Sequence, residues 1–327
     1  MTPLGELLAA EIERSGPIPF DEFMAHALYH PEYGYYRRMR DPFGKHGDFY
    51  TAGQLQPVFG ILIAQRIRQL ASAMGDPEDF TVVELGAGRG EMADAFAAWR
   101  YVPVEIERGS MPSRFRGVVF SNEFFDALPV KVVKYERGEF REQRVAFNSG
   151  RFQWTSGEPV PDHTERYLRA DYAPPEEGRC YEMSALNPWM ERIAESLAEG
   201  WVLTIDYGFT REESVRFPQG TLMSYRRHAA LEDVLADPGE RDITAHVNFT
   251  AMRDLGRAHG LVEENFGTLA QMLLAAGEAD QFAAALGTGA GEPRRRLQLK
   301  TLLFGLGETF RVLLQRRDSN RSELSER

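Results

Sequence analysis

The sequence predicts an α/β protein built around a largely parallel sheet. Short runs of β-branched and aromatic residues alternate along the chain with segments whose apolar residues recur at helical spacing. A glycine-rich turn at residues 86–90 joins the first clear strand, residues 81–85, to a segment with helical spacing. Strands that alternate with helices in this way form parallel sheets. Ligands bind at the carboxyl ends of the strands of such sheets, so residues that directly follow a strand are the first candidates for a site.

The order of the elements places a helical region before the sheet. Helices are expected over residues 4–12, 20–28, 55–73, 91–99, 187–198, 250–259 and 297–306. Strands are expected over residues 81–85, 102–106, 117–121, 201–206, 261–266 and 310–315. We therefore expect an N-terminal helical region with a loop over residues 1–75 and a sheet-containing core over residues 76–327. Two insertions in this core are expected, a loop insertion at 209–249 and a helical one at 267–309.

A third insertion is expected between residues 131 and 180. It contains two turn signals, Glu136-Arg137-Gly138 and Asn148-Ser149-Gly150, between segments of alternating character. Turn residues at this spacing between alternating segments are typical of consecutive β-hairpins. The segment therefore predicts a β-meander inserted in the fold.

The composition limits the kinds of partner. Lys and Arg number 38 against 49 Asp and Glu, giving a net charge of −11. A chain this acidic repels phosphate backbones, so no nucleic-acid partner is expected. The single cysteine, Cys180, excludes an internal disulfide and fits a reducing compartment. No apolar run is long enough for membrane insertion, and the N-terminus has no signal-peptide pattern, so we expect a cytoplasmic protein.

The glycine turn, VVELGAGRG, predicts a cofactor site with unusual charge. Its glycines do not follow the dinucleotide pattern G-x-G-x-x-G, and acids stand on both sides, Glu84 before the turn and Glu91 after it. Like charges about 4 Å apart cost on the order of 4 kcal/mol, so a pyrophosphate fits poorly and a nicotinamide oxidoreductase is disfavoured. S-adenosylmethionine carries no phosphate but has a sulfonium and an ammonium, which carboxylates favour. A plain tight turn between strand and helix is the alternative.

Glu105 extends this candidate site. It lies at the end of the next expected strand, where an acid commonly accepts hydrogen bonds from ribose hydroxyls. The glycines allow the backbone to approach the ligand closely. The candidate cofactor-binding residues of this part of the chain are Glu84, Gly86, Ala87, Gly88, Gly90 and Glu105.

Several further segments carry a resemblance to a known family. They are GPIPFDEFM, ALYHPEYGYY, GDFYT, FGILIAQRI, VVELGAGRGEM, NEFFDALPV, IDYG, TLMSYRRH, DITAHVNF and LGETFRVL, in this order along the chain. In these segments the chain resembles the MidA-type family of class I methyltransferases, which includes the mitochondrial complex I assembly factor that methylates an arginine. The resemblance implies a Rossmann-like methyltransferase sheet with helical additions, S-adenosylmethionine as cofactor and an arginine-bearing protein as substrate.

The sequence departs from the family pattern at two places. Only residues 106–117 separate the second strand from NEFFDALPV, with Gly109 and Pro112 inside them. This is too short for the helix and strand that the family has there, so we expect a sheet shortened by one strand–helix unit. After GDFYT the chain has Ala52-Gly53-Gln54 where the family tends to have Ser-Pro-Glu. An amide thus replaces a carboxylate in that loop.

The acceptor side of the site is expected after the later strands. An arginine acceptor must lose a proton, and paired carboxylates can grip its planar guanidinium and favour that loss. Glu123 and Asp126 are the candidates for this pair, Asn122 for orienting the acceptor or the cofactor, and Asp206 is the next candidate. The alternative for Glu123 and Asp126 is a strand-end cap and a turn.

The loop that contains GDFYT supplies the last two candidates. Asp48 and Thr51 lie in it, and the resemblance implies a glycine-hinged lid over the cofactor, with a surface turn as the alternative. Taken together, the sequence predicts an S-adenosylmethionine-dependent protein methyltransferase that acts on arginine. A catalytically inactive assembly factor with the same fold that binds a partner protein, and a methyltransferase of small molecules, remain as alternatives.

Overall fold

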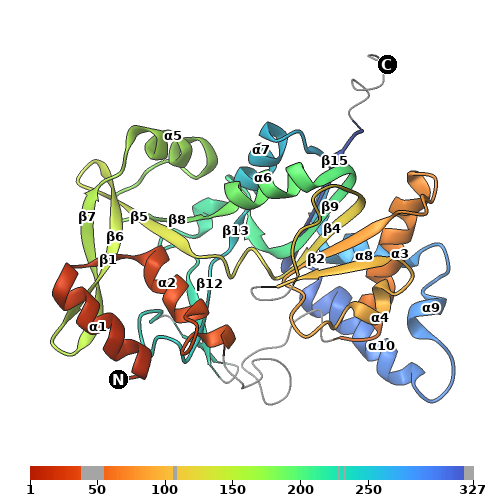
Figure 1. Ribbon diagram of the computed structural model, residues 1–327, viewed down its shortest axis with the longest axis horizontal. Helices are drawn as coiled ribbons and strands as arrows, with labels where there is room; N and C mark the ends of the chain where they lie inside the picture. The colour runs from red at the N-terminus through yellow and green to blue at the C-terminus, as the bar shows by residue number, and fades with distance from the viewer. Residues whose placement is uncertain (38–54, 106–108, 227–228, 232, 320–327) are drawn as a thin grey trace. The chain divides into compact units, whose positions relative to one another are not determined.

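The computed structural model describes residues 1–37, 55–105, 109–226, 229–231 and 233–319, and they fall into two compact units (Figure 1). Unit 1 consists of Met1–Tyr50, Phe125–Ala185 and Phe209–Thr250. Unit 2 consists of Thr51–Phe124, Leu186–Gly208 and Ala251–Arg327. The chain therefore passes between the units several times, and each unit is assembled from segments that are distant in the sequence.

The sheet of unit 2 confirms the predicted α/β class. Its strands are β2 (Thr81–Leu85), β3 (Arg100–Val104), β4 (Phe115–Asn122), β9 (Leu197–Phe209), β14 (Val262–Thr268) and β15 (Phe310–Arg317). They are hydrogen-bonded in the order β14-β15-β9-β4-β2-β3. The pairs β2–β3, β2–β4 and β4–β9 are parallel, whereas β15 pairs antiparallel with both β9 and β14. Parallel pairing thus dominates where β2 and β4 lie.

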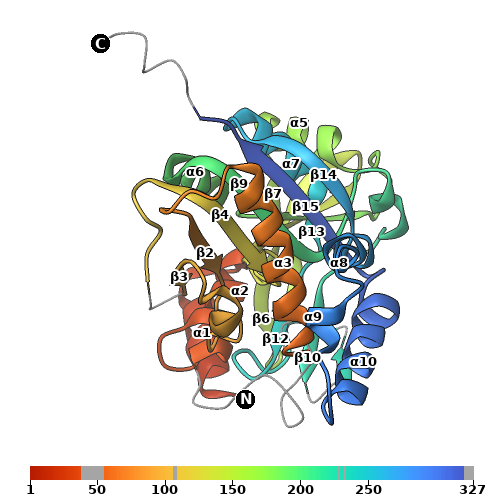
Figure 2. The same ribbon diagram turned by 90° about the vertical axis from the view of Figure 1, so that its right-hand side faces the viewer.

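The helices of unit 2 bury the sheet. They are α3 (Val58–Ala73), α4 (Ala93–Phe96), α6 (Leu186–Ser196) and α7 (Phe249–Ala258), which begins in unit 1. Along β4, Val118 and Phe120 join one apolar cluster with Phe59 and Ile63 of α3, and Leu269 of the C-terminal helical segment belongs to it too. Figure 2 shows α3 running across the sheet on this side. Since Val119, between Val118 and Phe120, is also fully buried, β4 lies in the middle of the core.

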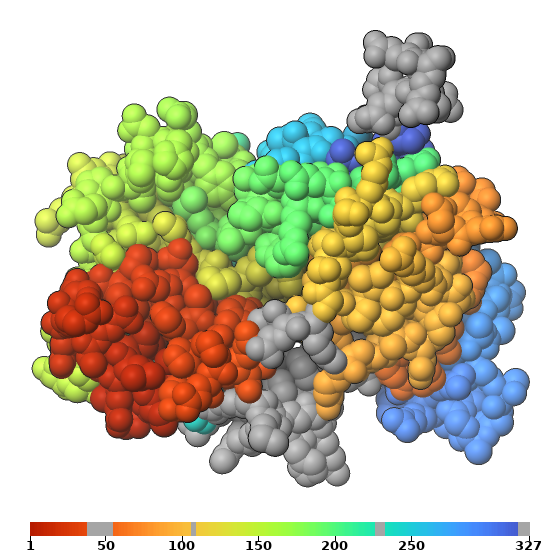
Figure 3. All heavy atoms as spheres, in the orientation of Figure 1, coloured from red at the N-terminus to blue at the C-terminus, as the bar shows by residue number. Residues whose placement is uncertain are grey.

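A helical segment precedes the last strand, as expected for residues 267–309. It comprises α8 (Leu269–Gly277), α9 (Ala283–Leu286), α10 (Glu292–Lys300) and η4 (Thr301–Leu306), a π-helical turn. Thr268 begins α8 with a capping box in which Gln271 is the partner. This segment lies on the outside of unit 2, in blue in Figure 3, and it exposes Leu297 and Phe304. The helix expected over 297–306 is therefore two successive helical segments with different hydrogen bonding.

The shortened connection after β3 is confirmed for the residues that the structure describes. β3 ends at Val104 and β4 begins at Phe115, and neither Glu105 nor the described residues 109–114 form a helix or strand. β3 is consequently the edge strand of the sheet.

The helix expected over residues 91–99 is wrong in length. Only Ala93–Phe96 is helical, because the chain leaves the glycine turn in irregular backbone and must already start β3 at Arg100. The crossover between the parallel strands β2 and β3 therefore spans only residues 86–99, close to the minimum for such a connection. A helix of four residues has a weak dipole, so the charge near the turn comes from its carboxylates.

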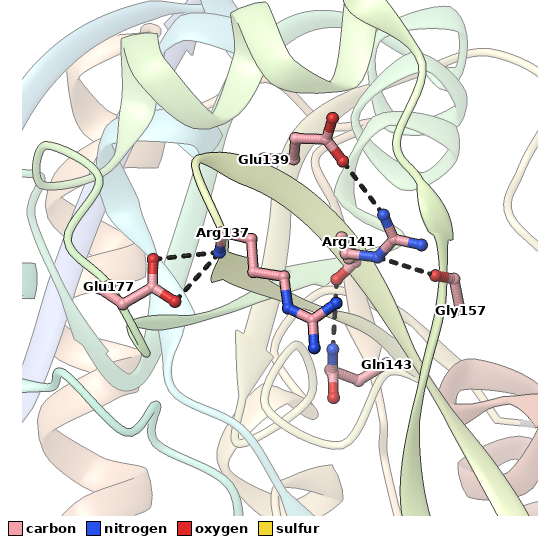
Figure 4. A network of polar contacts seen from close by, with 6 residues as sticks. All are labelled: Arg137, Glu139, Arg141, Gln143, Gly157 and Glu177. Carbon is pink, nitrogen blue, oxygen red and sulfur yellow. Dashed lines mark hydrogen bonds and ion pairs between the residues drawn. The ribbon is translucent and has the colours of Figure 1, made fainter.

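Unit 1 contains the predicted meander. β5 (Val130–Glu136), β6 (Glu139–Asn148) and β7 (Arg151–Pro159) pair antiparallel in succession, and α5 (Asp162–Asp171) and β8 (Cys180–Ser184) follow. The two predicted turns join these strands, and both residues of each turn have positive φ, as two-residue hairpins require. Figure 4 shows how the β5–β6 turn is held: the backbone N–H of Arg137 donates to both carboxylate oxygens of Glu177. Nearby, the Arg141 guanidinium donates to the Gly157 carbonyl.

The remaining elements of unit 1 come from two parts of the chain, and one of them, Ile18–Pro19, adds a short strand to this sheet beside β6. They are α1 (Pro3–Ser15), β1 (Ile18–Pro19), α2 (Phe20–Tyr29) and η1 (Tyr35–Arg37), followed later in the chain by η3 (Glu213–Arg216), β10 (Met223–Arg226), β11 (Ala229–Leu231), β12 (Asp242–Thr244) and β13 (Val247–Asn248). Fully buried residues of α2, such as Phe23 and Met24, share a cluster with Val130, Val132 and Val145 of the meander. A second cluster beneath α5 contains Leu168 and Tyr181.

The structure groups the segments differently from the expected boundary at residue 75. α3 was placed with the N-terminal helices, but its apolar face packs on the sheet of unit 2. The first two helices instead share their core with the meander, residues that follow far later in the sequence. A helix joins the unit that buries its apolar face, whatever its neighbours in the sequence.

The position of Phe120 gives a prediction about stability. Phe120 is fully buried on β4 and meets the ring of Phe96 edge to face, so Phe120→Ala should lower the free energy of unfolding by about 3–5 kcal/mol. Chemical denaturation followed by the fluorescence of Trp99 and Trp201 measures this, because both pack in the same cluster. Val262→Ala on an exposed position of β14 is the control and should change stability by less than about 0.5 kcal/mol. A similar change in both variants would contradict the placement of Phe120 in the core.

Candidate functional site

The carboxyl ends of three neighbouring parallel strands lie side by side in unit 2. The last paired residue of β2, Leu85, is in register with Ser121 of β4, and Asn122 of β4 is in register with Ile205 of β9. The residues that follow, Gly86, Glu123 and Asp206, therefore emerge at the same edge of the sheet. This edge is where ligands bind in parallel α/β sheets.

The glycine turn forms a tight loop directly after β2. Gly86 and Gly88 have φ angles of +69° and +53°, a region that L side chains rarely adopt. The N–H of Gly86 donates to the Val104 carbonyl at 3.0 Å, which ties the turn to the end of β3, and Ala87 is buried. The N–H of Gly90 donates to the Ala87 carbonyl at 2.8 Å. A Cβ at Gly86 would lie 2.9 Å from the ring of Phe124, so a glycine is required there.

Glu105 reaches the glycine turn as predicted. It follows β3 directly, and its Oε1 accepts a hydrogen bond of 3.1 Å from the N–H of Gly88. Glu105, which we expect to bind the ribose, therefore contacts Gly88, whose backbone we expect to approach the cofactor.

Glu84 is a buried carboxyl group at the start of the turn. It is 5% exposed, and its Oε2 accepts a hydrogen bond of 2.5 Å from the hydroxyl of Tyr101. Burial raises the pKa of Glu84 to about 7; the Tyr101 hydroxyl lowers it, and the nearby charges of Glu91 and Glu105 add to the increase. Near neutral pH this group therefore exchanges between its neutral and charged forms. Tyr101 is a site residue that sequence reasoning missed.

Asn122 and Glu123 form a linked pair at the end of β4. Glu123 has a φ of +51°, an uncommon backbone conformation for a residue with a side chain. Its N–H donates to the Ile205 carbonyl at 3.0 Å, and its Oε1 accepts a 3.0 Å hydrogen bond from the amide of Asn122. The other amide atom, Oδ1 of Asn122, is buried and has no hydrogen-bond partner within the part of the chain that the structure describes. Such an acceptor is suited to a ligand donor.

Asp206 holds the backbone next to this pair. It is fully buried on β9, directly after the last residue that pairs with β4, and its Oδ2 accepts a 3.3 Å hydrogen bond from the N–H of Phe124. Its Oδ1 accepts one of 2.9 Å from the N–H of Tyr207. Both carboxylate oxygens are thus engaged by main-chain donors, and this favours a positioning role for Asp206.

Phe124 and Trp189 form an aromatic contact beside the turn that sequence reasoning also missed. The ring of Phe124 faces Gly86, and Trp189 of α6 meets it edge to face with ring centroids 4.8 Å apart. Phe124 is not among the residues predicted for the site, because an aromatic pair after a strand gives no signal that separates packing from a site wall.

The other predicted residues are not placed with this set. Asp126 belongs to unit 1, where it is buried and its backbone carbonyl accepts a hydrogen bond from Ala245. Asp48 and Thr51 lie outside the described residues. In the part of the chain that the structure describes, no cluster of His, Cys, Asp and Glu suited to a metal ion is found. None of the described helices has both the length and the apolar character needed to cross a bilayer.

Comparison with known proteins identifies the family. Residues 96–266, just over half of the chain, match a family described as "Putative S-adenosyl-L-methionine-dependent methyltransferase". The chain belongs to this methyltransferase family. Its fold resembles the crystal structure of a superfamily member from Burkholderia thailandensis bound to S-adenosylhomocysteine, with a TM-score of 0.86 and 29% identity over 97% of this chain and 92% of that one. A native crystal structure from the same organism gives a TM-score of 0.82 with 30% identity, again over 97% of this chain and 92% of that one.

The chain is also similar to mitochondrial proteins of animals. The Drosophila melanogaster protein arginine methyltransferase NDUFAF7 homolog, mitochondrial, is 29% identical over 79% of this chain and 71% of its own length. The Homo sapiens protein arginine methyltransferase NDUFAF7, mitochondrial, is 26% identical over 79% of this chain and 69% of its own length. The predicted fold, family, cofactor and enzyme class are therefore confirmed: this is a class I methyltransferase that uses S-adenosylmethionine.

The glycine turn gives the first test of the cofactor site. Gly88→Val should abolish binding of S-adenosylmethionine, because a branched side chain at a φ of +53° both strains the turn and fills its open side, where a Cβ meets only Glu91. Calorimetric titration measures the binding. Gly75→Val is a matched control, since Gly75 has a φ of +85° in the same unit with nothing near its Cβ. Normal binding by Gly88→Val would show that the turn only connects β2 to α4.

Glu84 gives a test against pH. Its folded-state pKa of about 7 lies above the ordinary value of 4.5, so the folded protein binds more protons than the unfolded chain between these values. Stability from this group should therefore fall as the pH rises from 4.5 to 7, by on the order of 3 kcal/mol in all. Denaturation of wild type and Glu84→Gln across this range isolates the effect. The difference between them should change with pH only in that window, and a constant difference would contradict a buried, protonated Glu84.

Proposed function

We propose that this methyltransferase transfers a methyl group to an arginine side chain of a protein substrate. The observation that carries the proposal is the conformation of Glu123 at the end of β4, with φ of +51°. A non-glycine residue in this region costs on the order of 1–3 kcal/mol and persists where the surroundings hold it for a function. Here the Ile205 carbonyl fixes its N–H, and the Asn122 amide fixes its carboxylate.

The names of the relatives support arginine as the acceptor. Those from Drosophila melanogaster and Homo sapiens are called protein arginine methyltransferases, and this chain aligns with more than two thirds of each. A guanidinium is a planar cation with five N–H donors, and a fixed carboxylate is its natural partner. Glu123 supplies such a carboxylate at the edge of the sheet that also carries the glycine turn.

The residues around the turn fit the cofactor in charge and shape. Glu84, Gly86, Ala87, Gly88, Gly90 and Glu105 would hold it: the glycines leave the backbone open, and the two carboxylates suit a ligand with positive charge and ribose hydroxyls. The buried Oδ1 of Asn122, which has no hydrogen-bond partner among the described residues, offers an acceptor for an ammonium or a guanidinium donor. When bound, the cofactor supplies an activated methyl group on a cationic sulfur.

The protein's own part in the reaction is alignment and proton removal. Glu123 would accept hydrogen bonds from two N–H groups of the guanidinium and orient the remaining nitrogen toward the methyl carbon. In the transfer that nitrogen would gain its bond to the methyl carbon as the bond from this carbon to sulfur breaks, and the proton that the guanidinium loses would pass to the Glu123 carboxylate. Asp206 would keep Phe124, and through it the end of β4, in place.

Asp126 stays a proposed acceptor residue on the evidence of the sequence, where it follows Glu123 by three residues. Asp48 and Thr51 are proposed as cofactor contacts from the loop at 47–51. We also propose a cytoplasmic location, whereas the named relatives carry the word mitochondrial in their names. The net charge of −11 supports a protein rather than a nucleic acid as the partner.

Substitution of the two acids tests the acceptor role. Glu123→Gln and Asp126→Asn should keep the affinity for S-adenosylmethionine within a few-fold but slow methyl transfer about 30- to 4,000-fold, the range for losing one member of a buried charged pair. The assay follows labelled methyl groups into protein from a lysate of cells that lack this methyltransferase. Glu278→Gln, an exposed acid of unit 2, is the control and should transfer normally.

Three results would contradict parts of this proposal. Loss of cofactor binding in both variants would move the two acids to the cofactor side of the site. Normal transfer by both variants would leave Glu123 and Asp126 as strand-end caps. If the wild type binds S-adenosylmethionine but labels no lysate protein or peptide, a non-catalytic assembly role is favoured, which the short connection after Glu105 would suit.

A further inference from the structure

Tyr101 contacts the acid that precedes the glycine turn, and the proposed reaction does not use it. Its hydroxyl donates a 2.5 Å hydrogen bond to the buried carboxyl group of Glu84. We infer that Tyr101 is a positioning residue for cofactor binding: its hydroxyl favours the charged form of Glu84, which attracts a cationic ligand. The inference rests on the proposed role of Glu84 in the cofactor site.

The sheet fixes this contact. Tyr101 on β3 is in register with Val82 on β2, and Val82 lies on the same face of its strand as Glu84. Tyr101 is therefore a diagonal neighbour of Glu84, within reach for a long side chain. The ring of Tyr101 also packs against Phe96, with centroids 5.7 Å apart, and joins the edge of the main apolar cluster. The hydroxyl is thus held where it is by strand pairing and by ring packing.

The other groups around Glu84 oppose its charge. Burial and the carboxylates of Glu91 and Glu105 all raise the pKa of Glu84, and among the described residues it is the Tyr101 hydroxyl that lowers it. Glu91 follows the glycine turn and Glu105 follows β3, so both are fixed by the same local structure. Without a donor at Tyr101, the neutral form of Glu84 would dominate at neutral pH.

A neutral donor suits this task better than a cationic one. Lys or Arg would pair with Glu84 and cancel the negative charge that a sulfonium or ammonium needs. A phenol hydroxyl stabilises the carboxylate while leaving its charge in place. The pair Tyr101–Glu84 therefore gives the turn a negative charge that remains available to the ligand, and binding of the cation should release protons near neutral pH.

Tyr101→Phe tests the inference, because it removes the hydroxyl and keeps the ring against Phe96. Losing a charge-assisted hydrogen bond should move the pKa of Glu84 up by on the order of one pH unit. Binding of S-adenosylmethionine should then be roughly fivefold weaker at pH 7, with the loss shrinking as the pH rises. Calorimetric titrations from pH 5.5 to 8.5 on wild type, Tyr101→Phe, Glu84→Gln and the double variant measure this.

Glu84→Gln is the reference variant, because it keeps every other group whose protonation changes with pH, including the amino group of the ligand. The ratio of each dissociation constant to that of Glu84→Gln isolates the contribution of Glu84. We expect this ratio to change with pH for wild type around pH 7 and at higher pH for Tyr101→Phe. In the Glu84→Gln background, Tyr101→Phe should have no pH-dependent effect.

Two outcomes would overturn the inference, and only the second would also overturn the proposed role of Glu84 in cofactor binding. In the first outcome, Tyr101→Phe binds the cofactor normally, or more weakly by the same factor at every pH, while Glu84→Gln changes how binding depends on pH. Tyr101 then only packs against its neighbours, and Glu84 keeps its proposed role. If Glu84→Gln matches wild type in both affinity and pH profile, Glu84 is not a cofactor residue, and its proposed role fails together with the inference.

Discussion

The parallel pairing of β2, β4 and β9 is the constraint on which the site depends. The pairing sets Leu85 beside Ser121 and Asn122 beside Ile205, so β2 and β4 end, and the pairing of β4 with β9 ends, at one edge. Every residue of β2 is buried, and a one-residue slip would turn its apolar side chains to the opposite face. The core thus fixes the register, and the register determines the positions of the polar residues that follow the strands.

The edge of the sheet concentrates features that are unfavourable by themselves. Glu84 is a carboxyl group with little access to water, Glu123 has a left-handed backbone, and Asn122 keeps a buried oxygen without a hydrogen-bond partner among the described residues. Features of this kind are tolerated where a rigid core surrounds them, and they gather at sites of binding and catalysis. A cationic cofactor and a cationic acceptor would offset the excess of acidic groups, which explains why an acidic turn can belong to a working site.

Much of the fold and part of the site could be predicted from the sequence, since both rest on local patterns. Turn residues at 137–138 and 149–150 gave the meander, and the acid after the second strand gave Glu105, which does contact Gly88. Tertiary packing decided the rest. α4 is short because β3 must begin at Arg100, and α3 joins unit 2 because its apolar face meets that sheet. The contacts of Tyr101 with Glu84 and of Phe124 with Gly86 need the strand register, which spacing along the chain does not reveal.

The central claim is that the edge formed by β2, β3, β4 and β9 binds S-adenosylmethionine through its glycine turn and acids. A crystal structure of this methyltransferase with S-adenosylhomocysteine tests it most directly. The account predicts that the Glu105 carboxylate lies within hydrogen-bond distance of the ribose hydroxyls and that the amino-acid end of the ligand lies beside Gly86 and Asn122. A ligand bound elsewhere on the protein, or one at this edge without contacts to Glu105 and the glycine turn, would contradict the account.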